Sequence, residues 1–171
     1  TPLAQIKEAG ALNTSFVDLL VGNCGGTIGE TCAIALILGG VYLIVKKVIS
    51  WRTPVVYIAT VLVLTYIFKL SGIEAASARQ PIQELFAGGL MLGAFFMATD
   101  YVTSPITPNG KLVFGVCLGL LTFIFRMFGG SAEGVSYAII FCNLLVPLIE
   151  RVTVPKSFGK KKPEKKAKEA A

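Results

Sequence analysis

The sequence predicts an all-helical protein that crosses a membrane with about five helices. Two observations support this prediction. Of the 171 residues, 54% are hydrophobic and 15% are charged, whereas soluble domains carry about 25% charged residues. In addition, five apolar stretches reach or approach the roughly 20 residues needed to cross a hydrocarbon core, at 31–49, 54–70, 85–102, 112–128 and 135–149.

The chain divides into three predicted regions. Residues 1–30 form an amphipathic or re-entrant segment in which apolar residues recur at helical spacing. Residues 31–151 hold the five spans, and 152–171 form a basic tail. The first residue is threonine and not methionine, so we interpret the chain as the C-terminal part of a longer protein or as a processed product.

Positive charge is unevenly distributed along the chain, whose net charge is +6. With the C-terminus in the cytoplasm, the inner segments hold the lysine-rich tail with Lys46, Lys47, Arg52, Lys111 and Arg151, and the outer segments hold Lys7, Lys69, Arg79 and Arg126. The positive-inside rule favours this orientation, which places Thr1 on the outer side. The tail suits contact with anionic lipid better than contact with nucleic acid.

The composition argues against a metal centre made by this chain alone. The sequence contains no histidine, and its four cysteines form no Cys-x-x-Cys pair. Zinc, haem and iron–sulfur sites are built largely from those groups. Cys117 and Cys142 lie within predicted spans and are expected to pack as small apolar residues.

Local signals mark the individual spans. Span one contains Gly39 and Gly40, which let another helix approach closely. Pro54 suits the first turn of span two, and span three combines glycines with phenylalanines, as expected for a tightly packed helix. Turn residues at 103–110 separate spans three and four, and Pro147 is expected to kink span five.

A glycine-rich run precedes span one, and we name Gly25, Gly26, Thr27, Gly29 and Glu30 as candidate ligand-binding residues. Glycine permits close approach to the backbone, and a helix N-terminus offers N–H groups to an anion such as phosphate. The alternative is a tight turn whose glutamate is a first-turn acid. A similar run at 129–134 precedes span five, and two such runs facing one layer suggest a shared cavity.

Acidic residues at membrane depth are costly and are candidate functional residues. Asp100 ends span three, and Thr99 and Thr103 add oxygen ligands suited to a hard cation. Glu133 lies in the second glycine-rich run. These four residues are candidates for an ion path, and the alternative is that each acid is a solvated or salt-bridged helix end.

Several motifs at ordered spacing resemble one family of membrane proteins. They are Thr-Pro-Leu at 1–3, Gly-Asn-Cys-Gly-Gly-Thr-Ile-Gly-Glu-Thr at 22–31, Trp-Arg-Thr-Pro at 51–54, Phe-Met-Ala-Thr-Asp-Tyr-Val-Thr-Ser-Pro at 96–105 and Gly-Gly-Ser-Ala-Glu-Gly-Val at 129–135. Up to the basic tail, the chain is similar to the C-terminal half of the RnfD membrane flavoprotein subunits, to which the NqrB subunits are related.

The resemblance implies a subunit of an ion-translocating (Na⁺ or H⁺) ferredoxin:NAD⁺ oxidoreductase in a bacterial or archaeal plasma membrane. It implies FMN joined to Thr1 by a phosphoester bond, a noncovalent riboflavin, and the second half of a ten-helix fold related to urea transporters. The implied partners are a membrane iron–sulfur pair, an outer-face flavoprotein, and cytoplasmic subunits that bind ferredoxin and NAD⁺. The Ser-Gly-Ala that precedes the modified threonine in the family is absent, because this sequence starts at Thr1.

Two other interpretations stay open at this stage. One is the related B subunit of the Na⁺-translocating NADH:quinone reductase. The other is half of a urea-transporter-like solute channel, which explains the glycine breaks but not the Thr-Pro-Leu start. A scaffold without a ligand would carry no flavin at all.

Overall fold

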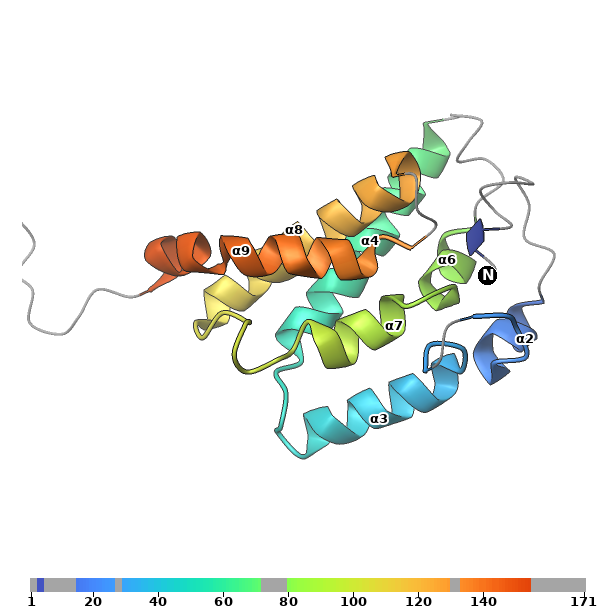
Figure 1. Cartoon of the computed structure of the whole chain (residues 1–171), viewed down its shortest axis with the longest axis horizontal. Helices are drawn as coiled ribbons and strands as arrows, with labels where there is room; N and C mark the ends of the chain where they lie inside the picture. The colour runs from blue at the N-terminus through green and yellow to red at the C-terminus, as the bar shows by residue number, and fades with distance from the viewer. Residues whose placement is uncertain (1–2, 5–14, 27–28, 72–79, 130–132, 155–171) are drawn as a thin grey trace, which may run out of the picture.

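The computed structural model describes residues 3–4, 15–26, 29–71, 80–129 and 133–154, and all regular structure within them is helical (Figure 1). Among these residues, three helices are long and apolar enough to cross a membrane: α4 (Arg52–Leu70), α8 (Pro108–Phe128) and α9 (Val135–Thr153). The prediction of an all-helical, multi-pass membrane protein is confirmed. Thr1, Thr27 and the tail beyond residue 154 lie outside the described residues.

The first apolar stretch forms a shorter helix than predicted. Helix α3 (Ala33–Val45) has 13 residues, and at 1.5 Å per residue it is about 20 Å long, which is less than the roughly 30 Å of a hydrocarbon core. It is preceded by the short helix α2 (Phe16–Val21), which ends at Gly22 with a left-handed φ of 94°. The polar segment between α2 and α3 contains the first glycine-rich run.

The third apolar stretch is interrupted, which differs from the continuous helix that its composition predicts. Helix α6 (Pro81–Phe86) ends at Ala87, whose backbone is extended. Gly88 follows with a φ of 73°, so the α-helix cannot continue through it. The chain then resumes as α7 (Leu90–Leu92) and the π-helical turn η1 (Gly93–Met97). The result is a broken helix.

Helices α4 and α8 form a closely packed pair because glycines of α8 face α4. A Cβ atom on Gly119 would lie 2.5 Å from Cβ of Thr60 in α4, and one on Gly115 would lie 3.1 Å from Cβ of Val56. Small residues four positions apart allow two membrane helices to approach in this way. Across the same contact, the hydroxyls of Tyr57 and Thr122 are 2.6 Å apart and hydrogen-bonded.

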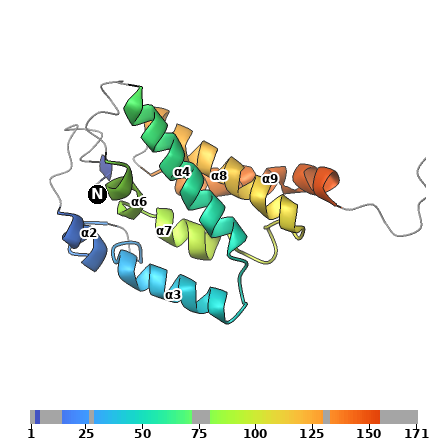
Figure 2. The same ribbon diagram turned by 180° about the vertical axis from the view of Figure 1, so that it is seen from behind.

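The broken helix lies between α3 on one side and the long helices on the other, as both ribbon views show (Figures 1 and 2). Helix α3 contacts α7 and η1, while α4 and α9 contact η1 from the opposite side. Phe95 of η1 fills the space over Gly40 of α3, where a Cβ atom would overlap the ring. The predicted close approach at the glycine pair of span one is therefore confirmed.

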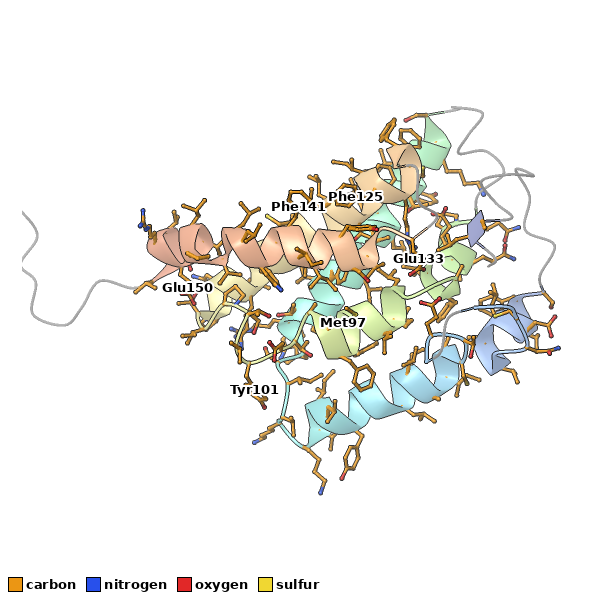
Figure 3. The ribbon with its side chains drawn as sticks, in the orientation of Figure 1. Met97, Tyr101, Phe125, Glu133, Phe141 and Glu150 are labelled. Atoms are coloured by element: carbon orange, nitrogen blue, oxygen red, sulfur yellow. The ribbon has the colours of Figure 1, made fainter. Side chains whose placement is uncertain are left out.

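Helix α9 packs along α8. The rings of Phe125 and Phe141 lie 6.0 Å apart between these two helices (Figure 3). Cys142 is fully buried in the same core, as predicted for a small apolar residue. Because α4, α8 and α9 cover one side of the broken helix, the Gly88 turn is enclosed between them and the α2–α3 segment.

Candidate functional site

The break at Gly88 and Gly89 is the point where distant parts of the chain meet. A Cβ atom on Gly88 would overlap a carboxyl oxygen of Glu133 and would lie 2.5 Å from Cδ1 of Leu3. Leu3 is 2% exposed and packs with Leu19 and Ala87. The absence of side chains at the turn is what lets a carboxyl group and the start of the chain reach the backbone.

Glu30 and Glu133 converge on the same glycine. The backbone N–H of Gly89 donates a hydrogen bond of 2.7 Å to Oε1 of Glu133. A Cβ atom on Gly89 would lie 2.8 Å from Oε2 of Glu30 and 3.0 Å from Oε2 of Glu133. Both carboxyl groups therefore approach the same point on the backbone of Gly89. The two glycine-rich runs, which are alike in the sequence, thus contribute one acid each to a single site.

The surroundings of Glu133 favour its neutral form. Burial raises the pKa of the Glu133 carboxyl, and the charge of Glu30 raises it further. The hydrogen bond from Gly89 and the positive charge of Arg126 act in the opposite direction. Burial has the largest effect because a carboxylate loses its hydration inside the protein.

Arg126 of α8 reaches the same turn from the other side. Its terminal nitrogens donate to the carbonyl oxygens of Glu84, at 2.8 Å, and of Ala87, at 3.2 Å. These carbonyls lie at the end of α6, where the helix leaves its last C=O groups without backbone partners. The guanidinium group thus replaces hydrogen bonds that a continuous helix would have made. Arg126 and Glu84 are each only 2% exposed.

Glu84 and Arg126 are site residues that the sequence analysis missed. The charge count assigned Arg126 to an outer segment, but the structure buries it at the broken helix. A signal was present, because Arg126 lies inside the apolar stretch 112–128 and a charge within a span is expensive unless it is paired. Glu84 gave no comparable signal, since it adjoins a polar loop in the sequence.

The first glycine-rich run encloses very little space. A cavity of about 10 Å³ is lined by the run and by the broken helix, through Cys24, Gly25, Gly26, Glu30, Thr31, Phe86 and Gly88. That volume holds about one water molecule, so a flavin ring does not fit inside it. Gly25 and Gly29 have open space where a side chain would be.

The four ion-path candidates do not form one cluster. Asp100 is exposed, and its Oδ2 accepts a 3.2 Å hydrogen bond from Thr103. The Thr99 hydroxyl donates to the carbonyl of Phe95 within its own helix. Glu133 lies at the opposite end of the α7–η1 segment from Tyr101, the neighbour of Asp100 (Figure 3). The described part of the chain contains no group of three acidic, cysteine or histidine residues that could hold a metal ion.

Comparison with known proteins connects this arrangement to one family. The model of the NQR2, RnfD, RnfE family matches residues 1–159. A relative from Acetobacterium woodii, named as the D subunit of a Na(+)-translocating ferredoxin:NAD(+) oxidoreductase complex, is 44% identical over 98% of this chain and 51% of its own length. A relative from Clostridium ljungdahlii, named as the proton-translocating equivalent, is 44% identical over 90% of this chain and 46% of its own. The chain spans about half the length of these curated relatives.

Proposed function

This chain belongs to the NQR2, RnfD, RnfE family, and from that premise we propose that it is a membrane subunit of an ion-translocating ferredoxin:NAD⁺ oxidoreductase complex. The observation that carries the proposal is the match across nearly the whole chain to relatives with that name. A charged cluster buried at a broken helix supports it, because such breaks form ion and substrate sites in transport proteins. The alternative interpretations have no comparable support.

We propose that this chain carries FMN through a phosphoester bond to Thr1. The support is positional: Leu3 packs beside Gly88, and two residues of extended chain reach at most about 7 Å. A group on Thr1 would therefore be tethered near the broken helix, and the open backbone at Gly25 and Gly29 would form one side of its binding surface. When bound, FMN supplies one- and two-electron transfer.

Residues of this chain would hold the binding surface in a fixed shape. Arg126 fixes the end of α6, and the Gly89 N–H orients Glu133. The packed leucines and Ala87 exclude water from the inner side of the turn. Ion passage would use Glu133 with Glu30, and Asp100 with its threonines would serve at the other end of the broken helix.

The remaining parts of the proposal concern partners and orientation. The electrons would come from and pass to other subunits: a membrane iron–sulfur pair, an outer-face flavoprotein, and cytoplasmic subunits for ferredoxin and NAD⁺. This chain would have no NAD site of its own. The basic tail would lie in the cytoplasm and Thr1 towards the outer face, in line with the distribution of lysine and arginine.

The test is flavin fluorescence of the denatured polypeptide in a gel, with the mass of the peptide that contains Thr1. We expect a fluorescent band and an added mass of one FMN in the full-length chain. Thr1→Ala should remove both signals, while the matched Thr14→Ala should keep them. Acid precipitation would separate a noncovalent riboflavin, which is released into the supernatant. A fluorescent band that persists in Thr1→Ala would refute the attachment site.

A further inference from the structure

An apolar groove lies between the first half of α8 and the last half of α9. Its volume is about 300 Å³, and its walls are formed by two residues of α8 and several of α9: Val113, Cys117, Leu145, Leu148, Ile149 and Val152. Leu145, Leu148 and Val152 are exposed, so the groove opens at the surface of the helix bundle. Because both helices are long and apolar enough to cross a membrane, that surface is available to lipid.

The polar groups that border the groove are already satisfied. Thr153 also lines it, but its hydroxyl donates to the carbonyl of Ile149 and accepts from the hydroxyl of Thr107, each at 2.8 Å. The Cys117 thiol behaves as a small apolar group. The walls therefore suit a hydrocarbon chain and not a polar ligand.

The length of the groove is close to the depth of one lipid leaflet. From Leu145 to Thr153, α9 rises about 12 Å, compared with about 15 Å for half of a hydrocarbon core. A helix about 10 Å across would fill about 900 Å³ over that length, which is three times the volume of the groove. An extended acyl chain fits this space better than a helix does.

Positive charge lies at the end of the groove where α9 ends. Arg151 is three positions after Leu148 and so lies on an adjoining part of the helix surface. It is exposed, and its guanidinium has no partner within the described part of the chain. The sequence continues with Lys156 and a lysine-rich tail. The nearby acid Glu150 accepts the backbone N–H of Ile106 at 3.1 Å.

We propose that this groove binds one acyl chain of an anionic phospholipid, whose phosphate lies against Arg151 and the first lysine of the tail. The groove is no more apolar than the surrounding lipid, so packing holds the chain and the headgroup gives the preference. Each basic residue near the headgroup should favour an anionic over a zwitterionic lipid about fivefold, which corresponds to about 1 kcal/mol. This site depends on the membrane location of the chain and is independent of the flavin and of the ion path.

The first experiment is photo-cross-linking of the intact complex in phosphatidylcholine vesicles. The probes are phosphatidylglycerol and phosphatidylcholine, each with a diazirine in one acyl chain, and peptide mass spectrometry locates the adducts. We expect adducts on Leu145, Leu148 and Val152, with a yield at least about fivefold higher for phosphatidylglycerol. Equal yields, or adducts spread evenly over the exposed residues of α8 and α9, would indicate ordinary surrounding lipid and overturn the proposal. Absence of adducts in the groove would indicate that another protein segment covers it and would also overturn the proposal.

The second experiment tests the two parts of the site separately. Cys117→Trp fills the groove and should abolish its adducts, whereas Leu120→Trp, at an exposed position of α8 outside the groove, should leave them unchanged. Arg151→Gln should reduce the preference for phosphatidylglycerol about fivefold, and the matched control Lys46→Gln, at an exposed position after α3, should not. An unchanged preference in Arg151→Gln would refute the headgroup contact, and this variant decides the question if Cys117→Trp does not assemble.

Discussion

The two ends of the α7–η1 segment both hold candidate acids, but the polar contacts at each end differ. At the Gly89 end, the contacts join residues far apart in the sequence: Gly89 and Glu133 are 44 positions apart, and Arg126 and Glu84 are 42 apart. At the Asp100 end, Thr103 bonds to a residue three positions away and Thr99 to one four positions away. The first end is buried and the second is exposed.

This difference shows that oxygen ligands close together in the sequence do not by themselves make a site. Asp100 has threonines on both sides, yet their hydroxyls are used locally, as threonine in a helix commonly does. Glu133 instead meets a second carboxyl group and the N–H of Gly89 at a break in the backbone. In this chain, the break in the helix and the burial bring acids of distant segments together at Gly89.

The largest effect is expected for Arg126→Gln. The change removes hydrogen bonds to two buried carbonyls and the cation beside two glutamates, so the free energy of unfolding should fall by about 3–5 kcal/mol. Thermal unfolding in detergent measures this loss. Arg151→Gln, on an exposed position of α9, should change stability by less than about 0.5 kcal/mol. Equal effects of the two substitutions would contradict the role given to Arg126.

The next largest effect is expected for Gly88→Val. The new side chain would overlap Glu133 and press on Leu3, and valine is strained at a φ of 73°. Overpacking and strain together should cost about 2–4 kcal/mol. Gly25→Ala is the matched control, since nothing lies within 4 Å of the added methyl group. A stable Gly88→Val protein would show that the turn is less closely packed than described.

A smaller effect is expected in the dependence of stability on pH. The pKa of Glu133 is raised by burial, so the native state holds a proton that the unfolded chain has released. The free energy of unfolding should therefore decrease as the pH rises from the ordinary glutamate value to the raised native value, and then level off. Unfolding of wild type and Glu133→Gln across a pH series isolates this slope. If the free energy of unfolding of wild type, relative to Glu133→Gln, increased with pH over this range, the raised pKa of Glu133 would be refuted.

The smallest effect is expected for Asp100→Asn at the other end. The carboxyl group is exposed, and its hydrogen bond from Thr103 spans one turn, so stability should change by less than about 0.5 kcal/mol. The same unfolding assay compares it with Glu133→Gln. If Asp100→Asn lowered the free energy of unfolding more than Glu133→Gln does, the Asp100 end would be the more important one for stability, contrary to the comparison made here.

The sequence predicts the helical class and the location of all five apolar stretches, because composition and length are local properties. It also points to Glu30 and Glu133 through two similar glycine-rich runs. It does not predict the break at Gly88, since Gly88 and Gly89 look like the small residues of a packed span. Helix termination there depends on Arg126, which is 42 positions from its partner and whose placement no local pattern specifies.

The same long-range contacts set an order for the assembly of the domain. During synthesis, the N–H of Gly89 and the carbonyls at the end of α6 precede their side-chain partners by about forty residues. Until α8 and the segment before α9 have been made, these backbone groups have neither Arg126 nor Glu133 to bond with. Contacts between distant residues are slow to form, so we expect the turn at Gly88 and Gly89 to close only after Arg126 and Glu133 have been made.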